Sequence, residues 1–288
     1  MLPQLLLNGI IAGSIYSLVA LGFALIYQTA RFFHFAHGAV YTFGAYFAYL
    51  FYIQLGLERV IAFPLACVAT MVLGIGCELI VYRPMRKRKA TELTLLIASL
   101  GLYTVLQNII SMVWGDDTKT MRTGEVLEGH EILGARITDI QIAIIITSLM
   151  LMALTALMLS RTKFGKALRG LANDPDVARL CGINSNRYLM YSFAIGSFLA
   201  AIAAIMISFD TDMTPTMGFN ALVMGVIAVI VGGIGSLPGA ALGGLFIGLA
   251  QNLGVWQLPS KWQDTIAFVI LILFLLFRPK GILGKKTA

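Results

Sequence analysis

Apolar residues dominate this chain in long runs that charged and turn residues separate. Most of these runs are close to the roughly 20 residues that an α-helix needs to cross the hydrocarbon of a bilayer. One core helix of a soluble protein would explain a single run, but not their recurrence from end to end. The pattern predicts an all-α integral membrane protein, a polytopic bundle of eight or nine transmembrane helices. The apolar segments fall at about 4–28, 32–53, 60–82, 92–114, 140–160, 188–209, 219–234, 238–256 and 263–278.

Two of these segments fit a full crossing poorly. Segment 219–234 is short, and the second segment of the chain begins amid His34 and His37. Both fit half-helices that enter the membrane and turn back, near 32–40 and 219–240. Non-helical backbone at that depth is tolerated only where it is buried in protein or lines water.

Composition supports the same interpretation. Hydrophobic residues make up 58% of the chain and charged residues 12%, about half the charged share of an ordinary soluble domain. We therefore expect a single transmembrane domain over residues 1–288. The stretch 1–27 has no positive n-region, because the first basic residue is Arg31, and it is predicted to be a retained span rather than a signal peptide.

The charged residues predict how the chain is oriented. Lys and Arg in alternating loops number sixteen on one side, including Lys285 and Lys286 near the C-terminus, against five on the other. By the positive-inside rule the first side, with the C-terminus, is cytoplasmic. The other side carries ten acids, concentrated in an extracytoplasmic loop at 115–139. Short basic loops that flank spans contact membrane lipid, so we expect no nucleic-acid partner despite the net charge of +7.

No motif for catalysis or for an ATP site is found. The tail 284–287 resembles the end of a phosphate-binding loop, but Pro279 stands where that motif needs its first glycine. There is also no H-E-x-x-H and no G-x-S-x-G motif. We expect no catalytic residue and no cofactor bound by this chain, so that ATP, if it drives transport, is hydrolysed by partner subunits.

The basic loop at 161–187 is predicted to contain two short helices. Asp174 is a good N-cap for the second helix, and Pro175 stands at the first helical position, where a missing N–H costs nothing. Arg179 falls in its last turn, and Gly182 is placed to end it in a left-handed conformation. A rigidly capped helix of two turns follows from this pattern.

The first helix of the loop is predicted at about 164–171, with Lys166 and Arg169 on its polar side. Such a loop could lie on lipid headgroups, but that needs a large continuous apolar face. Docking into the groove of another protein fits two short capped helices better. The expected coupling residues are Phe164, Gly165, Lys166, Ala167, Leu168, Arg169, Asp174, Pro175, Val177, Ala178, Arg179 and Gly182.

His34 and His37 are three residues apart and share one face of a helix. Two ligands without a nearby Cys or acid make a poor metal site, so no metal is expected. Either the two side chains hydrogen-bond between helices, or they face a water-filled path, as ionisable groups inside membranes usually do. The candidate residues for a translocation path are Asn8, His34, Phe35, His37, Gly38 and Asn220.

Gly235, Gly239 and Gly243 recur every four residues, and Gly244 and Gly248 repeat the spacing. Small residues at this spacing let membrane helices pack closely. The apolar pattern is interrupted just before this face, which predicts a turn between two half-length segments. Interrupted helices often line a substrate path, although close packing alone explains the pattern equally well.

Three blocks of this sequence resemble the shorter permease type of the branched-chain amino acid ABC transporter family. The likeness spans nearly the whole chain, and the blocks occur in the order that the family has. Where the family commonly has Asn and an acid around Phe-Ala-His-Gly, this chain has His34 and Ala39. The matching blocks are 164–169 with 174–183, 8–22 running on to 35–38, and 231–240.

The resemblance implies a permease subunit of a bacterial inner membrane importer that forms the path for branched-chain, aliphatic amino acids. It also implies a second permease of the longer type, two cytoplasmic ATPase subunits that meet the loop at 161–187, and an extracytoplasmic solute-binding protein. Urea and short amides are alternative solutes, since similar permeases carry them. An ion-coupled secondary transporter is the alternative of another class, but it usually needs a buried acid at mid-membrane, and no predicted span has one deep inside it.

Overall fold

The computed structural model describes residues 1–122, 129–132 and 134–284, and parts of the predicted loop 115–139 as well as Lys285 and Lys286 lie outside these ranges. Two short strands, β1 (His130–Ile132) and β2 (Ala135–Ile137), pair antiparallel. π-Helical turns extend α2 at Leu50–Gln54 and α3 at Cys77–Tyr82, and a 3₁₀ turn at Ser260–Trp262 precedes α12. The α-helices are α1 (Leu2–Ala30), α2 (Ala36–Tyr49), α3 (Arg59–Gly76), α4 (Arg83–Lys87), α5 (Glu92–Trp114), α6 (Asp139–Arg161), α7 (Lys163–Asn173), α8 (Pro175–Leu180), α9 (Ser185–Asp210), α10 (Met217–Gly232), α11 (Leu237–Gly254) and α12 (Gln263–Phe277).

The structure does not confirm the predicted number of spans. Within the described ranges, six helices are long and apolar enough to cross a membrane, or seven if α10 and α11 form one broken span, against the eight or nine expected. These two helices meet at an angle of 118°. The bend is made by Gly233 and Gly235. Their φ angles of 113° and 89° lie in a region that residues other than glycine rarely adopt. The chain at 31–35 is not helical. Helix α2 therefore begins later than the predicted apolar segment 32–53 and is shorter than that segment.

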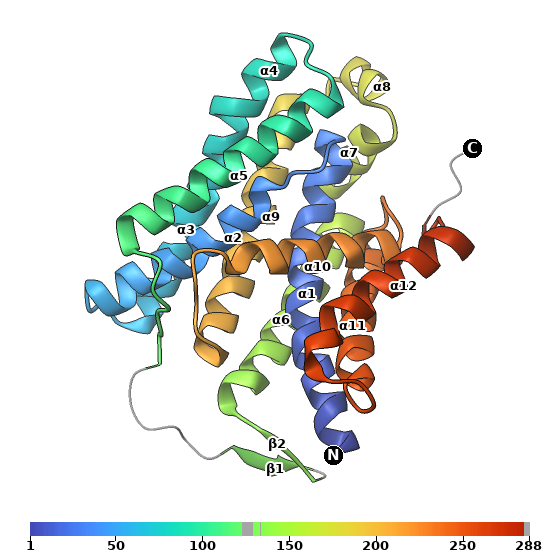
Figure 1. Cartoon of the computed structure of the whole chain (residues 1–288). Helices are drawn as coiled ribbons and strands as arrows, with labels where there is room; N and C mark the ends of the chain where they lie inside the picture. Colours follow the sequence, from blue (N-terminus) through green and yellow to red (C-terminus); the bar gives the residue numbers. More distant parts are fainter. Residues whose placement is uncertain (123–128, 133, 285–288) are drawn as a thin grey trace.

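Helix α1 forms the centre of the bundle, in contact with α6, α9, α10 and α11 (Figure 1). In its most apolar stretch 83% of the residues are buried inside the protein, whereas the corresponding share for α12 is 6%. The apolar side chains of α12 therefore face lipid or another subunit. Because both helices are uniformly apolar, their sequences do not show which one is buried within the protein and which one is exposed on its surface.

Helices α1 and α11 cross at small residues, where their backbones touch. A Cβ atom on Gly248 would lie 2.3 Å from the Gly13 nitrogen, and one on Gly244 would lie 2.5 Å from the Ser17 nitrogen. The Ser17 hydroxyl donates a 2.7 Å hydrogen bond to the Ala241 carbonyl across the same crossing. Small residues thus provide the close approach on which helix association in a bilayer depends.

The glycines at four-residue spacing divide between two roles. Gly239 and Gly243 pack against α10, since a Cβ on each would lie 2.3 Å and 2.1 Å from the carbonyl oxygens of Gly232 and Ala228. Gly235 differs from the expected packing role: it lies in the bend before α11, and no described atom comes within 4 Å of the position of its Cβ. Its carbonyl accepts a 2.9 Å hydrogen bond from the Gln28 amide of α1.

Replacing Gly248 with Ala is expected to lower the free energy of unfolding by about 1–3 kcal/mol, because the new methyl group overlaps the backbone of α1. The matched control is Gly101→Ala in α5, where no described atom lies within 4 Å of the new methyl group. That change should leave stability unchanged or raise it, since Ala favours helix over Gly. Unfolding of the two variants in detergent measures the difference, and equal stability would contradict the packing described.

Candidate functional site

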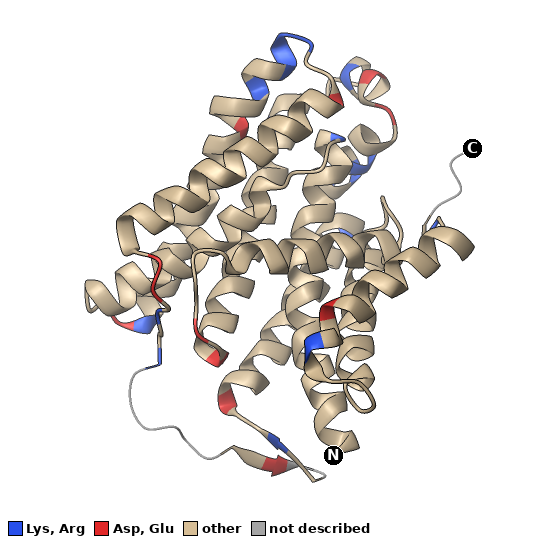
Figure 2. Ribbon diagram, in the orientation of Figure 1, with Lys and Arg blue, Asp and Glu red and all other residues tan. Residues whose placement is uncertain are grey.

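Charge separates the two ends of the bundle (Figure 2). Lys and Arg gather at the end that carries α4, α7 and α8, and acids predominate at the end with β1 and β2. At the basic end, the buried Glu78 carboxylate is bonded to Arg86. At the acidic end, Arg122 forms a 2.7 Å ion pair with Asp212. The two ends thus offer different surfaces to partners.

Helix α7 lies at the basic end with one face packed on the bundle. Thr162 caps it by accepting a 3.1 Å hydrogen bond from the Gly165 nitrogen. Leu168 and Leu171 are buried, whereas Lys166 and Arg169 on the opposite face are exposed. The predicted polar side of this helix is therefore the side that a partner can reach.

Three contacts tie α7 to the rest of the protein. A Cβ on Gly165 would lie 2.1 Å from the Leu159 carbonyl oxygen, so the helix rests directly on the backbone of α6. Phe164 stacks on Tyr188 of α9, with ring centroids 5.5 Å apart. The Arg31 guanidinium at the end of α1 donates to the Ala172 carbonyl. Helix α7 is thus in direct contact with α1, α6 and α9.

Helix α8 is fixed at both ends, as its sequence predicts. The Asp174 carboxylate accepts hydrogen bonds of 2.9 Å and 3.0 Å from the nitrogens of Asp176 and Val177, and Pro175 is the first helical residue. Gly182, at φ 80°, ends the helix in the left-handed conformation. The segment is a rigid projection rather than a flexible loop.

The exposed tip of α8 is apolar, which the sequence analysis recognised only in part. Ala178 is the one residue of this helix that is buried. Leu180 is 87% exposed and Val177 54% exposed. Leu180 was not among the expected coupling residues, although its place two residues from the buried Ala178 puts it on the outer face. Exposed apolar side chains on a rigid projection are typical of a docking surface.

Arg179 has a structural role within the same loop. Its Nε donates to the Ser185 hydroxyl at 3.2 Å, and its Nη1 lies 3.2 Å from the Asp176 carboxylate. These bonds hold α8 against the start of α9. Among the expected coupling residues, Arg179 therefore positions the helix, while Lys166 and Arg169 form no ion pair with the part of the chain that the structure describes.

The two histidines lie in the core of the chain. Both side chains are fully buried, and the Nδ1 atom of His34 lies 2.9 Å from the Tyr82 hydroxyl. His37 packs on Gly22 of α1, where a Cβ would lie 3.2 Å from the His37 Nε2 atom. Within the described ranges, no three His, Cys, Asp or Glu side chains gather as metal ligands would. The histidines thus lie at helix contacts rather than on a surface open to solute.

The neighbours of the histidines are also engaged in packing. Gly38 of α2 lies against α10, because a Cβ on it would lie 2.7 Å from the Gly218 carbonyl oxygen. Phe35 is half-buried against the same core. Asn8, near the start of α1, accepts a 3.0 Å hydrogen bond from Gln4, which in turn bonds the backbone of Arg136 in β2. These candidates hold the bundle together in the structure.

Asn220 is the candidate that the structure places on an open surface. The loop before α10 is held by paired backbone hydrogen bonds of 2.9 Å between Lys119 and Met213. In the first turns of α10, the exposed Asn220 amide donates to the Asp264 carboxylate of α12 at 3.3 Å. Asp264 is one of the ten acids that the sequence places on the outer side, but no local pattern reveals its pairing with Asn220, which the bend between α10 and α11 brings about.

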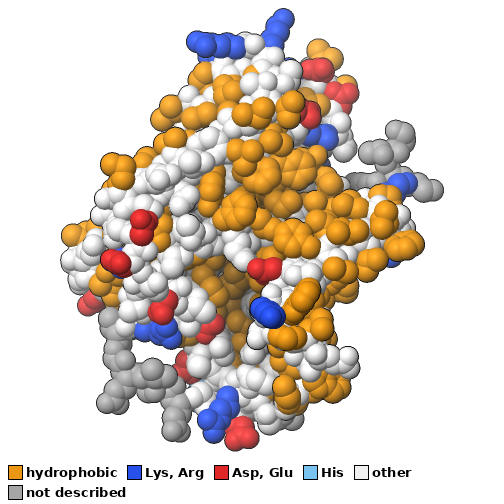
Figure 3. All heavy atoms as spheres, viewed as in Figure 1, with side chains coloured by type: hydrophobic (Ala, Val, Ile, Leu, Met, Phe, Trp, Pro, Cys, Tyr) orange, Lys and Arg blue, Asp and Glu red, His pale blue; other side chains and the backbone are white. Residues whose placement is uncertain are grey.

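The surface around this pair is apolar and hollowed. Phe219 is half exposed beside Asn220, and its ring lies 5.8 Å from that of Tyr103 in α5. Figure 3 shows hydrophobic side chains over α10 and α12 and a hollow on the same face. A carboxylate bonded to an amide, next to aromatic and aliphatic side chains, suits a small solute with a cationic group and an apolar part.

A family model described as the permease component of branched-chain amino acid transport systems matches residues 5–275. The high-affinity branched-chain amino acid transport system permease protein BraD of Pseudomonas aeruginosa is 36% identical over 98% of this chain and 95% of its own length. Its counterpart LivH of Escherichia coli is 35% identical over the same shares.

A solved structure supports the architecture. The chain is similar to one in the complex of PsaBC from Streptococcus pneumoniae with a Fab, at a TM-score of 0.54 over 97% of this chain and 92% of that one. The identity of 14% limits this likeness to the fold.

Replacing Gly165 with Ala is expected to loosen α7, because the methyl group would overlap the backbone of Leu159. Trypsin should then cut at Lys166 and Arg169 several-fold faster, since cleavage follows local opening. Gly170→Ala in the same helix is the matched control, with Ile183 Cδ1 at 3.8 Å from the new methyl group. Equal cleavage rates in both variants would show that Gly165 does not hold α7 in place.

Proposed function

This chain belongs to the family of permease components of branched-chain amino acid transport systems, and we propose that it forms the membrane path of an ABC importer for these amino acids. ATP is hydrolysed by separate subunits that move this chain between outward-open and inward-open states. The basic end with α4, α7 and α8 faces the cytoplasm, together with the C-terminus. A solute-binding protein docks at the acidic end.

The observation that carries this proposal is the rigid α7–α8 projection. An ATPase subunit can push the bundle only through a segment that does not yield, and both helices are capped and packed on α6 and α9. Leu180 and Val177 supply an apolar contact, with Lys166 and Arg169 alongside. Because Arg31 joins α7 to α1, a push on the projection reaches the central helix of the bundle.

The path itself lies along the face of α10 and α12. This face carries the Asn220–Asp264 pair, whose carboxylate favours water or polar groups over lipid, so a second polar surface completes the path. The permease of the longer type provides that surface. The Asp264 carboxylate attracts the ammonium group of the solute, while Phe219 and its apolar surroundings accept an aliphatic side chain.

The Asn220–Asp264 pair also bears on the choice of solute. Urea and short amides are neutral and gain little from a carboxylate, whereas a charge-assisted hydrogen bond to an ammonium group contributes about 1.5–3 kcal/mol. Amino acids therefore suit this face better than neutral amides.

Replacing Leu180 with Ser is expected to reduce solute-stimulated ATP hydrolysis in the reconstituted importer by about tenfold or more, as truncation of an interface hot spot does. Val60→Ser is the matched control, because Val60 is 81% exposed but lies at the acidic end. Copurification of the ATPase subunits is measured in parallel. If both variants couple as well as the unchanged protein, α8 is not the docking surface.

Replacing Asp264 with Asn is expected to slow leucine uptake into proteoliposomes by about tenfold, through loss of the charge that meets the ammonium group. Asp117→Asn removes an acid whose side chain is 91% exposed in a loop, and it should leave uptake unchanged. The ATPase subunits should remain bound in both variants. Uptake that persists in Asp264→Asn argues against this path, and uptake without any ATPase subunit would instead identify an ion-coupled transporter.

A further inference from the structure

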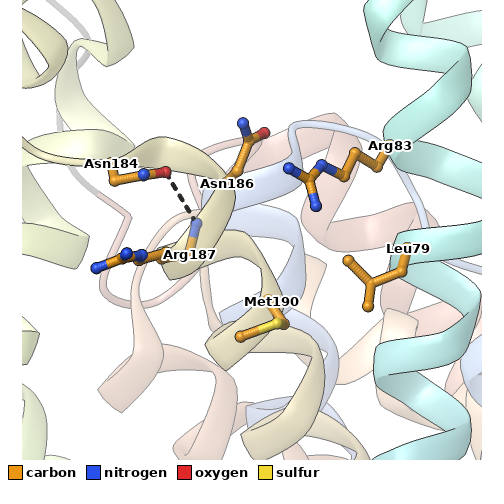
Figure 4. A pocket seen from close by; sticks show the side chains of 6 residues that line it. All are labelled: Leu79, Arg83, Asn184, Asn186, Arg187 and Met190. Carbon is orange, nitrogen blue, oxygen red and sulfur yellow. Dashed lines mark hydrogen bonds between the residues drawn. The ribbon is translucent and has the colours of Figure 1, made fainter.

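A cavity of about 310 Å³ opens between α3 and α9 at the basic end of the bundle. Figure 4 shows how its side chains lie: Arg83 extends from the start of α4 toward Asn186 at the start of α9, and Leu79 and Met190 lie deeper. The Arg187 side chain runs along the other side of α9. Asn184 completes the lining. The cavity is separate from the α8 tip and from the Asn220–Asp264 face.

The positive charge in this cavity is compensated only in part, because the nearby Glu78 interacts electrostatically with both Arg83 and Arg86. The Nε atom of Arg83 is buried and has no hydrogen-bond partner among the described residues. Glu78, the acid on the same helix, is already bonded to Arg86. The lining residues include two arginines and two asparagines and no acid. A partly buried guanidinium that lacks a partner favours an anion, because an unsatisfied buried donor is costly.

The cavity changes from polar to apolar in the same direction on both helices. Leu79 lies one turn before Arg83, and Met190 lies one turn after Asn186, so each apolar side chain is one turn farther into the bundle than its polar neighbour. Below Leu79, the stripe continues on the outer face of α3 with Val72 and Val68, which are 62% and 54% exposed. A cavity with a cationic mouth and an apolar inner end, followed by exposed apolar side chains on α3, matches an amphiphile with an anionic head.

We propose that this cavity binds an anionic phospholipid of the adjacent leaflet, with its phosphodiester on Arg83 and Asn186 and an acyl chain along Leu79, Val72 and Val68. Basic cavities between transmembrane helices on the cytoplasmic side suit such headgroups. A free phosphate would use the mouth but not the apolar floor. A protein partner could reach this cavity only with a segment that projects between the two spans, because the cavity is recessed there.

Native mass spectrometry of the full-length chain with its copurifying subunits tests the proposal, with dioleoylphosphatidylglycerol and dioleoylphosphatidylcholine as probes. The unchanged protein should retain phosphatidylglycerol in preference to phosphatidylcholine. Arg83→Gln should weaken phosphatidylglycerol binding by about fivefold, the effect of one cation near a membrane surface. Lys87→Gln removes one exposed charge from the same short helix but does not line the cavity, and it should leave binding nearly unchanged.

A second variant keeps the test decisive if Arg83→Gln unfolds. Asn186 is exposed in the first turn of α9, and Asn186→Asp places a negative charge at the mouth, so it should weaken phosphatidylglycerol binding at least as much. Equal binding of the two lipids, or equal losses in Arg83→Gln and Lys87→Gln, would overturn the proposal. Displacement of the lipid by millimolar inorganic phosphate would show a site for a free anion instead. Release of the ATPase subunits without loss of lipid would identify a protein contact.

Discussion

The crossing of α1 and α11 is the contact on which the rest of the structure depends. Lipid is as apolar as the side chains of a transmembrane helix, so the hydrophobic effect does not hold such helices together. What remains is close van der Waals contact and hydrogen bonding, and both are concentrated where Gly13 meets Gly248 and Ser17 meets Gly244 and Ala241. Because α1 also contacts α6, α9 and α10, its position fixes where the other helices lie.

The same central helix connects the two proposed functional surfaces. Its C-terminal end is bonded through Arg31 to α7, and through Gln28 to the bend between α10 and α11. The bend in turn sets the direction of α10, which carries Asn220 toward α12. A displacement at the projection therefore has a short physical route to the face with the carboxylate, through two hydrogen bonds at the end of one helix. This is a route of contact, and the two-state movement along it is part of the proposed function.

What the sequence could predict was local. Asp174, Pro175 and Gly182 act within a few residues of themselves, so the bounds of α8 followed from its sequence. The Asn220–Asp264 pair could not be found in this way, because 44 residues separate its members and a 118° bend brings them together. Gly235 illustrates the same limit: its spacing matched a packing face, but its positive φ placed it in the bend instead. The predicted count of eight or nine spans is not confirmed, because hydrophobicity shows neither a bend nor a non-helical start.

The place of Asp264 constrains what can cover the α10–α12 face. Asp264 is the second residue of α12 and lies in its first turn, and the hydrogen bond that its carboxylate accepts from Asn220 is long at 3.3 Å. Lipid against this pair would leave the carboxylate poorly compensated, whereas water or polar groups of a second subunit would satisfy it. The apolar surface of α12, by contrast, needs no such partner and tolerates lipid. The pair rather than the apolar area is therefore the reason to expect a water-filled path between two permease subunits at this face.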